Sequence, residues 1–166
     1  MFSNRITHRL HEEHRASVSL MQRLQALLAS QRCGAPNVGS DTVAMLLLRE
    51  IASGVDSDVK RHFDFEEQSL FSFLEGIGAA AIGAHLTEEH AAMRPLWQRL
   101  TALARAASSA GFHEASWTEF RQVGLELRER MLAHIQTEDM ALLPLLEESM
   151  DAQTEARMYD AYIANA

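Results

Sequence analysis

The sequence predicts an all-α protein, an up-down four-helix bundle with a short fifth helix at its C-terminal end. Strong helix formers dominate the 166 residues, whereas glycine (8) and proline (3) are few. Apolar residues recur at steps of three and four, as in amphipathic helices, and not in the alternation typical of strands. Breaks at residues 32–40, 76–78 and 108–111 separate the helical stretches. The length suits a single domain spanning residues 1–166.

Four long helices and one short helix follow from these breaks. The long helices are expected over residues 4–31, 41–74, 80–107 and 114–149. Their apolar stripes run from Ile6 to Leu28, Leu48 to Phe73, Ile82 to Leu100 and Phe120 to Leu142. The short helix, residues 152–163, is expected to pack across an open end of the bundle. Pro95 and Pro144 lie inside helical patterns and predict a kink near each, or a stop at Pro144.

Composition excludes several classes of function. The formal net charge of −8 disfavours a nucleic-acid surface. No segment has the apolar character of a signal peptide or the ~20 apolar residues that span a bilayer. Cys33 is the single cysteine and lies in a predicted loop, so neither a disulfide nor a thiolate site is expected. We therefore expect a cytoplasmic protein without nucleic-acid or membrane partners; a homodimer formed through the last helix is a candidate.

Each apolar stripe is interrupted at one level by a histidine. These are His14, His62, His90 and His134, and Glu66 and Glu138 follow two of them by four residues. Residues four apart lie about 40° from each other around a helix and one turn along it, so each His-Glu pair can converge on one site. A lone ionised glutamate in a core is costly, and two facing glutamates repel each other. A divalent cation between them removes both objections.

The donor types favour particular metals. Imidazole nitrogen with carboxylate oxygen suits iron, manganese or zinc, whereas calcium and magnesium prefer oxygen ligands throughout. Four imidazoles and two carboxylates exceed the needs of one tetrahedral ion but suit two octahedral ions bridged by the carboxylates. The expected metal ligands are His14, His62, Glu66, His90, His134 and Glu138. One His-x-x-x-Glu pair alone would more often be an exposed helical contact, and His14 or His90 alone could be a satisfied core histidine.

These motifs resemble the hemerythrin-like domains, also called HHE cation-binding domains. The matching pieces, in chain order, are Glu13-His14, His62 to Glu67, Glu89-His90 and His134 to Asp139, the last followed by Leu142-Leu143-Pro144. The resemblance implies a non-haem di-iron centre in which the four histidines are terminal ligands and Glu66 and Glu138 are bridges. It also implies binding or sensing of O2 or NO, or iron handling under oxidative or nitrosative stress.

Two departures from the oxygen carriers of that family bear on the site. Those carriers use a five-residue His-to-Asp step, which His134 to Asp139 would reproduce, so Asp139 competes with Glu138; the apolar stripe favours Glu138. They also place a second histidine four residues from the one on the third helix. Here His85 lies five residues before His90, about 140° around the helix, and is an alternative ligand. Four histidines suggest a more open centre, closer to relatives associated with iron-sulfur repair, NO handling or peroxide response.

Two alternatives stay open. One is an enzyme-like role in peroxide or NO reduction or in cluster repair, and the other is a structural zinc or other metal site. We expect surface positions for His8, His11 and His113, core packing for Phe63, Phe65, Phe71, Phe73 and Trp97, and an acidic rim of Glu12, Glu13, Glu67, Glu88 and Glu89. Some rim glutamates are expected to accept hydrogen bonds from the outer histidine nitrogens, a contact that metal sites usually need.

Overall fold

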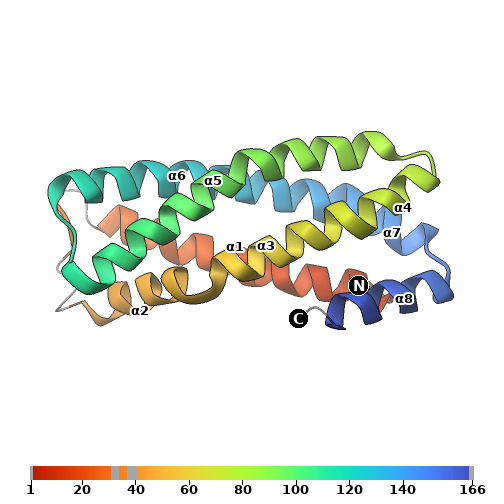
Figure 1. Cartoon of the computed structure of the whole chain (residues 1–166), viewed down its shortest axis with the longest axis horizontal. Coiled ribbons are helices and arrows are strands. Elements are labelled where there is room, and N and C mark those ends of the chain that lie inside the picture. Colours follow the sequence, from red (N-terminus) through yellow and green to blue (C-terminus); the bar gives the residue numbers. More distant parts are fainter. Residues whose placement is uncertain (1, 31–33, 37–40, 165–166) are drawn as a thin grey trace.

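The computed structural model describes residues 2–30, 34–36 and 41–164, and within them the chain forms helices and no strands. This confirms the predicted fold class. Four antiparallel helical segments lie side by side (Figure 1). The first is α1 (Arg5–Ser30), and the third is α5 (Ala80–Ala110). Cys33 lies outside the described residues.

The second and fourth segments are interrupted by π-helical turns. The second consists of α2 (Thr42–Glu50), η1 (Ile51–Val55), α3 (Asp56–Phe65), η2 (Glu66–Leu70) and α4 (Phe71–Gly76). The fourth consists of α6 (Glu114–Thr137), η3 (Glu138–Leu142) and α7 (Leu143–Ser149). The predicted outer bounds agree to within a few residues, but no π turn was expected in either segment; the only interruption predicted was a kink or stop at Pro144. Single π turns inside α-helices occur frequently at functional sites, and here η2 and η3 begin at Glu66 and Glu138.

The two prolines have different settings. Pro95 does not end α5, which continues to Ala110. Pro144 lies in the first turn of α7, directly after η3, where a missing backbone N–H is tolerated. The predicted stop at Pro144 is therefore wrong, because the π turn before it accommodates the proline and the helix continues to Ser149.

Local capping groups explain where two helices begin. The Asp41 carboxylate accepts hydrogen bonds from the backbone N–H groups of Val43 (3.1 Å) and Ala44 (3.0 Å) and starts α2. The exposed His113 forms a reciprocal capping box with Ser116 at the start of α6. His113 is thus a surface residue, as predicted, with a capping role that its residue type did not suggest.

The start of α1 has no acidic residue in its own first turn and is capped by two distant carboxylates. Glu147 accepts hydrogen bonds from the backbone N–H of Ser3 (2.6 Å) and from the hydroxyl of Thr7 (2.6 Å). Glu155 accepts one from the backbone N–H of Arg5 (2.9 Å). These contacts join both ends of the described chain.

The last helix, α8 (Ala152–Ala164), was expected to cross an open end of the bundle. It lies instead beside the N-terminal half of α1 (Figure 1). Arg5 contacts Glu155 (3.1 Å) and lies 4.4 Å from the ring centre of Tyr159. Because Glu155 of α8 accepts hydrogen bonds from the backbone and side chain of Arg5, side-by-side packing satisfies polar groups at the start of α1.

Two buried apolar clusters fill the bundle, one on each side of the histidine level. One contains Ile6, Leu10, Leu86 and Leu142, and the other contains Met21, Leu24, Met93, Trp97, Phe120 and Met131. In α1, Leu10 and Met21 lie on either side of His14 and belong to different clusters, and Leu86 and Met93 flank His90 of α5 in the same way. The polar residues are therefore enclosed by hydrophobic layers. In the described part of the chain, no helix combines the length and apolar character needed to cross a bilayer.

Candidate metal centre

Six polar side chains meet in the middle of the bundle, and they are the six that the sequence analysis selected. His14 comes from α1, His62 from α3, His90 from α5 and His134 from α6, while Glu66 and Glu138 open η2 and η3. All six are buried; Glu66, His90, His134 and Glu138 are fully inaccessible. Burial of two carboxylates in an apolar interior requires strong compensation.

The six residues form two sets of donors that share both glutamates. One set is His14, His62, Glu66 and Glu138, and the other is His90, His134, Glu66 and Glu138. The donor atoms of each set lie within 4.8 Å of one another. We call them the α1/α3 set and the α5/α6 set. Two ions held in these sets would have both carboxylates in common.

The inner imidazole nitrogens approach the shared carboxylates. His14 Nε2 lies 3.0 Å from Glu138 Oε2, and His134 Nε2 lies 3.2 Å from Glu138 Oε1. His62 Nε2 lies 3.3 Å from Glu66 Oε1, and His90 Nε2 lies 3.4 Å from Glu66 Oε2. Each glutamate therefore directs one oxygen towards a histidine of each set.

These short approaches do not satisfy the carboxylates as hydrogen bonds. None of the four oxygens of Glu66 and Glu138 has a hydrogen-bond partner among the described residues, and neither has Nε2 of His14. The Nε2 atoms of His90 and His134 lie only 3.1 Å apart. Two nitrogen lone pairs at that separation need a shared proton or a cation between them. The unsatisfied oxygens and crowded nitrogens fit a metal centre.

The outer nitrogen of every histidine contacts a carboxylate. His14 Nδ1 lies 2.7 Å from Asp139 Oδ1, and His62 Nδ1 lies 2.9 Å from Glu13 Oε2. His90 Nδ1 lies 2.8 Å from Glu67 Oε1, and His134 Nδ1 lies 2.8 Å from Glu89 Oε2. A carboxylate at Nδ1 holds the proton there, so that Nε2 presents its lone pair inward.

This arrangement confirms the predicted outer contacts for Glu13, Glu67 and Glu89 and adds Asp139, which the sequence analysis treated as a competing inner ligand. Asp139 lies on the outer side of His14, and its side chain is 29% exposed, whereas Glu138 is fully buried. His85, the alternative fifth histidine, is 60% exposed and contacts Glu89 at 3.3 Å. Neither residue belongs to the two donor sets.

The remaining predicted surface histidines lie outside these sets. His8 is half exposed and lies 3.9 Å from Glu12. His11 is partly exposed, and its Nδ1 lies 3.2 Å from Asp139. His11, His14 and Asp139 do place donor atoms near one another, but that cluster uses the outer nitrogen of His14 and is continuous with the centre.

Aromatic rings fix the histidines of the α5/α6 set. The ring of Phe63 stacks on His90, with 3.8 Å between ring centres and 11° between planes. The same ring meets His134 edge-on at 5.5 Å, and Phe71 lies 5.9 Å from His90. Phe63 was expected to be a core residue; it is buried and also packs directly against the centre.

In the metal-free protein, neighbouring charges shift the pKa values of Glu138 and His14 in the direction opposite to that of burial. Burial raises the pKa of Glu138, but His134 and His14 outweigh that effect and hold it well below the usual value. Burial lowers the pKa of His14, yet the hydrogen bond to Asp139 and the nearby negative charge of Glu138 raise it to about 9. The metal-free centre therefore balances its buried carboxylates with protonated imidazoles, and a metal ion would replace those protons.

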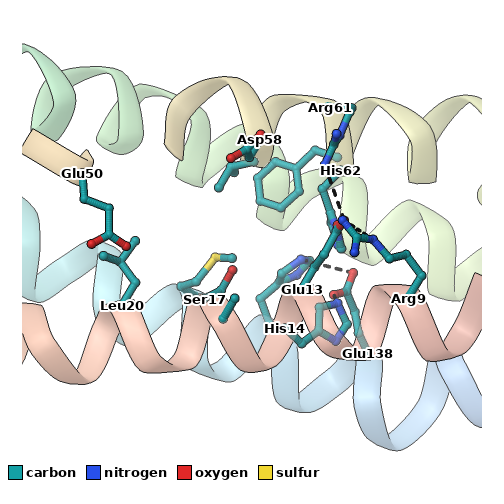
Figure 2. A pocket seen from close by; sticks show the side chains of 15 residues that line it. Arg9, Glu13, His14, Ser17, Leu20, Glu50, Asp58, Arg61, His62 and Glu138 are labelled. Atoms are coloured by element: carbon teal, nitrogen blue, oxygen red, sulfur yellow. Dashed lines mark hydrogen bonds and ion pairs between the residues drawn. The ribbon is translucent and has the colours of Figure 1, made fainter. Parts of the chain in front are cut away.

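A cavity of about 430 Å³ reaches the centre from the side of α1 and α3 (Figure 2). His14, His62, His134 and Glu138 lie at its inner end, whereas His90 and Glu66 do not line it. Its walls and mouth are formed by Arg9, Glu13, Ala16, Ser17, Leu20, Glu50, Asp58, Val59, Arg61, Phe63 and Met131. The α1/α3 set is therefore the more accessible of the two.

Comparison with known families agrees with this geometry. The sequence model described as the hemerythrin HHE cation binding domain matches residues 5–146, which include all six donors and all four outer carboxylates. The chain belongs to the hemerythrin HHE family. Hemerythrin HHE domains are cation-binding domains, and the buried His/Glu groups of this member fit that role. No curated protein sequence is similar enough to the chain to count as a relative.

Other features of this hemerythrin HHE domain were not predicted from its sequence. These are the outer role of Asp139, the π turns at both glutamates, the cavity, and the contact of Tyr162 with Glu13. Tyr162 lies in α8, beyond the residues that match the family. An aromatic residue in an amphipathic helix gives no sequence signal for such a contact.

Proposed function

We propose that this chain holds two iron ions as a non-haem di-iron centre and binds or senses O2, NO or peroxide through the cavity. The ligands are His14 and His62 for one ion, His90 and His134 for the other, with Glu66 and Glu138 shared. Iron suits this mixture of imidazole and carboxylate donors, as do manganese and zinc.

One observation carries the proposal: both fully buried glutamates belong to both donor sets. A single ion would leave at least one imidazole pair and several carboxylate oxygens unused in an apolar interior, which is costly. Two ions satisfy every inner donor. Family membership supports cation binding, and the donor count supports a pair.

The protein groups would have distinct tasks at the loaded centre. The outer carboxylates keep the protons at Nδ1 and orient the imidazoles, and the flanking apolar clusters restrict water. The cavity leads a small molecule to His14, His62, His134 and Glu138, and so to three donors of the α1/α3 set but only two of the α5/α6 set. When bound, iron would supply open coordination positions and reversible one-electron chemistry.

The decisive experiment combines metal analysis with spectroscopy. Protein reconstituted anaerobically with ferrous iron is expected to contain two irons per chain. On exposure to O2 or NO it should develop absorption that reverses when the gas is removed. Fewer than two irons per chain after reconstitution, with one redox-silent zinc in the protein as purified, would refute the di-iron proposal and leave the structural alternative.

The cavity also gives an enzyme-like role a specific observation in its favour. Its volume of about 430 Å³ is far larger than a diatomic molecule needs, since one water occupies about 30 Å³ in the liquid. A peroxide would fit that space, and its reduction would take two electrons per turnover from an added reductant. Steady turnover with peroxide and that reductant would identify the enzyme-like role. Stoichiometric, reversible gas binding without turnover would favour the sensing role.

A further inference from the structure

We propose that Tyr162 is a positioning residue for His62: its hydroxyl fixes the carboxylate of Glu13, which orients His62 and strengthens ion binding in the α1/α3 set. The inference rests on the proposed metal centre and adds to it a residue from α8. It also predicts that the two donor sets differ in their dependence on the C-terminal helix.

The contact is direct and converges on one oxygen. The Tyr162 hydroxyl donates a hydrogen bond to Glu13 Oε2, and the same oxygen lies 2.9 Å from His62 Nδ1. The other oxygen, Oε1, accepts from Arg9 Nε at 2.9 Å and lies 3.4 Å from an Arg61 nitrogen. Both carboxylate oxygens are thus restrained, which limits the orientations available to His62.

Tyr162 is itself held in place. Its side chain is only 1% exposed, and its ring centre lies 4.6 Å from that of Phe65. The Arg61 guanidinium lies 5.4 Å from the Tyr162 ring centre. Glu13 and Arg61 line the cavity (Figure 2), so Tyr162 contacts two residues of the cavity wall without lining the cavity itself.

The outer carboxylates of the other three histidines have different supports. Glu67 accepts a hydrogen bond from Arg94 at 3.0 Å. Glu89 lies 3.3 Å from exposed His85, and Asp139 lies 3.2 Å from partly exposed His11. Among these four, Glu13 is the carboxylate for which the structure shows a buried tyrosine donor.

The consequence is specific to one set. Removing the Tyr162 hydroxyl leaves Glu66, Glu138 and the α5/α6 set untouched but lets the Glu13 carboxylate rotate. The His62 ring is then held less firmly through Nδ1, so its Nε2 is less well oriented to bind the ion. Loss of an outer partner of a metal-binding histidine typically weakens binding by about 10- to 100-fold, so an effect one contact further out should be at the lower end.

The test titrates metal-free protein anaerobically with ferrous iron against a competing chelator. Tyr162→Phe keeps the ring that packs on Phe65 and removes only the hydroxyl. We expect two ions per chain, one bound as in the unmodified protein and the other about tenfold more weakly. Tyr159→Phe is the matched control on the same helix and should bind both ions unchanged.

A second measurement separates positioning of His62 through Glu13 from a general effect of α8 docking. Glu155→Gln weakens the contact between α8 and Arg5 without touching Glu13. In metal-free protein, nitrogen NMR should show a change at His62 Nδ1 in Tyr162→Phe and none in Glu155→Gln. Equal loss of affinity in both variants would overturn the inference, because docking of α8 would then be the cause.

Two other outcomes are equally clear. If the unmodified protein binds two ions and Tyr162→Phe matches it in both affinities and at His62, this inference fails while the proposed function stands. If the unmodified protein does not bind two ions, the proposed function fails, and the proposed effect on affinity fails with it.

Discussion

Glu138 and Asp139, adjacent in the chain, contact opposite nitrogens of the same imidazole ring. Glu138 Oε2 lies 3.0 Å from His14 Nε2, and Asp139 Oδ1 lies 2.7 Å from His14 Nδ1. The ring lies between a fully buried carboxylate and one that is partly exposed. Their different environments predict different consequences of mutation.

Replacing the inner carboxylates should remove a metal ion. Glu138→Ala or Glu66→Ala deletes a donor common to both sets, so we expect elemental analysis to show fewer than two ions per chain. Asp139→Asn should keep two ions while weakening binding by about 10- to 100-fold, because it disturbs only the orientation of His14. Retention of both ions by the alanine variants would refute the shared role.

Metal binding should weaken as pH falls. In the metal-free protein the pKa of His14 is raised to about 9 because Asp139 and Glu138 outweigh the opposing effect of burial. The ion requires the deprotonated imidazole, so below that value each displaced proton should cost about tenfold in affinity per pH unit. Chelator competition with zinc between pH 6 and 8 measures the slope, and an affinity independent of pH would contradict it.

Glu147→Gln should destabilise the metal-free fold by roughly 1 kcal/mol at neutral pH, the size of a lost helix cap. Burial raises the pKa of Glu147, but hydrogen bonds from Ser3 and Thr7 dominate and lower it to about 2. A lowered folded-state pKa stabilises the protein above the unfolded value of about 4.3. That contribution disappears as pH falls towards 2.

Urea unfolding of the metal-free proteins at pH 7 and near pH 2.5 checks this prediction. The difference between the unmodified protein and Glu147→Gln should shrink at the lower pH. The neighbouring exposed residue offers a control, Glu148→Gln, which should change little at either pH. A difference that is the same at both pH values would contradict the capping role.

Partly filling the cavity should slow the access of NO to the metal centre without removing metal. Ser17 lines the cavity, whereas Ser19 on the same helix is exposed and does not line it. Ser17→Phe should therefore reduce the rate of NO binding in stopped-flow measurements while metal content stays at two ions per chain. Ser19→Phe should bind NO at the normal rate. Equal rates for both variants would mean that ligands reach the centre by another route.

Much of the site followed from local sequence rules. A histidine on an apolar stripe, with a glutamate one turn later, fixes the direction of both side chains once the segment is helical. His62 with Glu66 and His134 with Glu138 were predicted in this way, and the structure brings them together with His14 and His90. Whether these residues hold metal stays a prediction.

Other parts of the site depend on contacts between distant segments. Asp139 was predicted only as a competitor of Glu138 for the inner role, because it follows His134 by five residues, but that spacing does not say which side of His14 it faces. The structure places it outside, 2.7 Å from Nδ1. The π turns beginning at Glu66 and Glu138 were missed as well: the first has no glycine or proline within it, and for the second Pro144 predicts only a kink or a stop, not a π turn.

By itself, the sequence determined the all-α class, the approximate helix bounds and the level at which six polar residues face the core, because helical periodicity is a local property. Only the tertiary structure decided that both glutamates belong to both donor sets, that a cavity reaches the α1/α3 set, and that Tyr162 meets Glu13. Those features depend on how helices far apart in the chain are turned towards one another, and packing of the whole core fixes that.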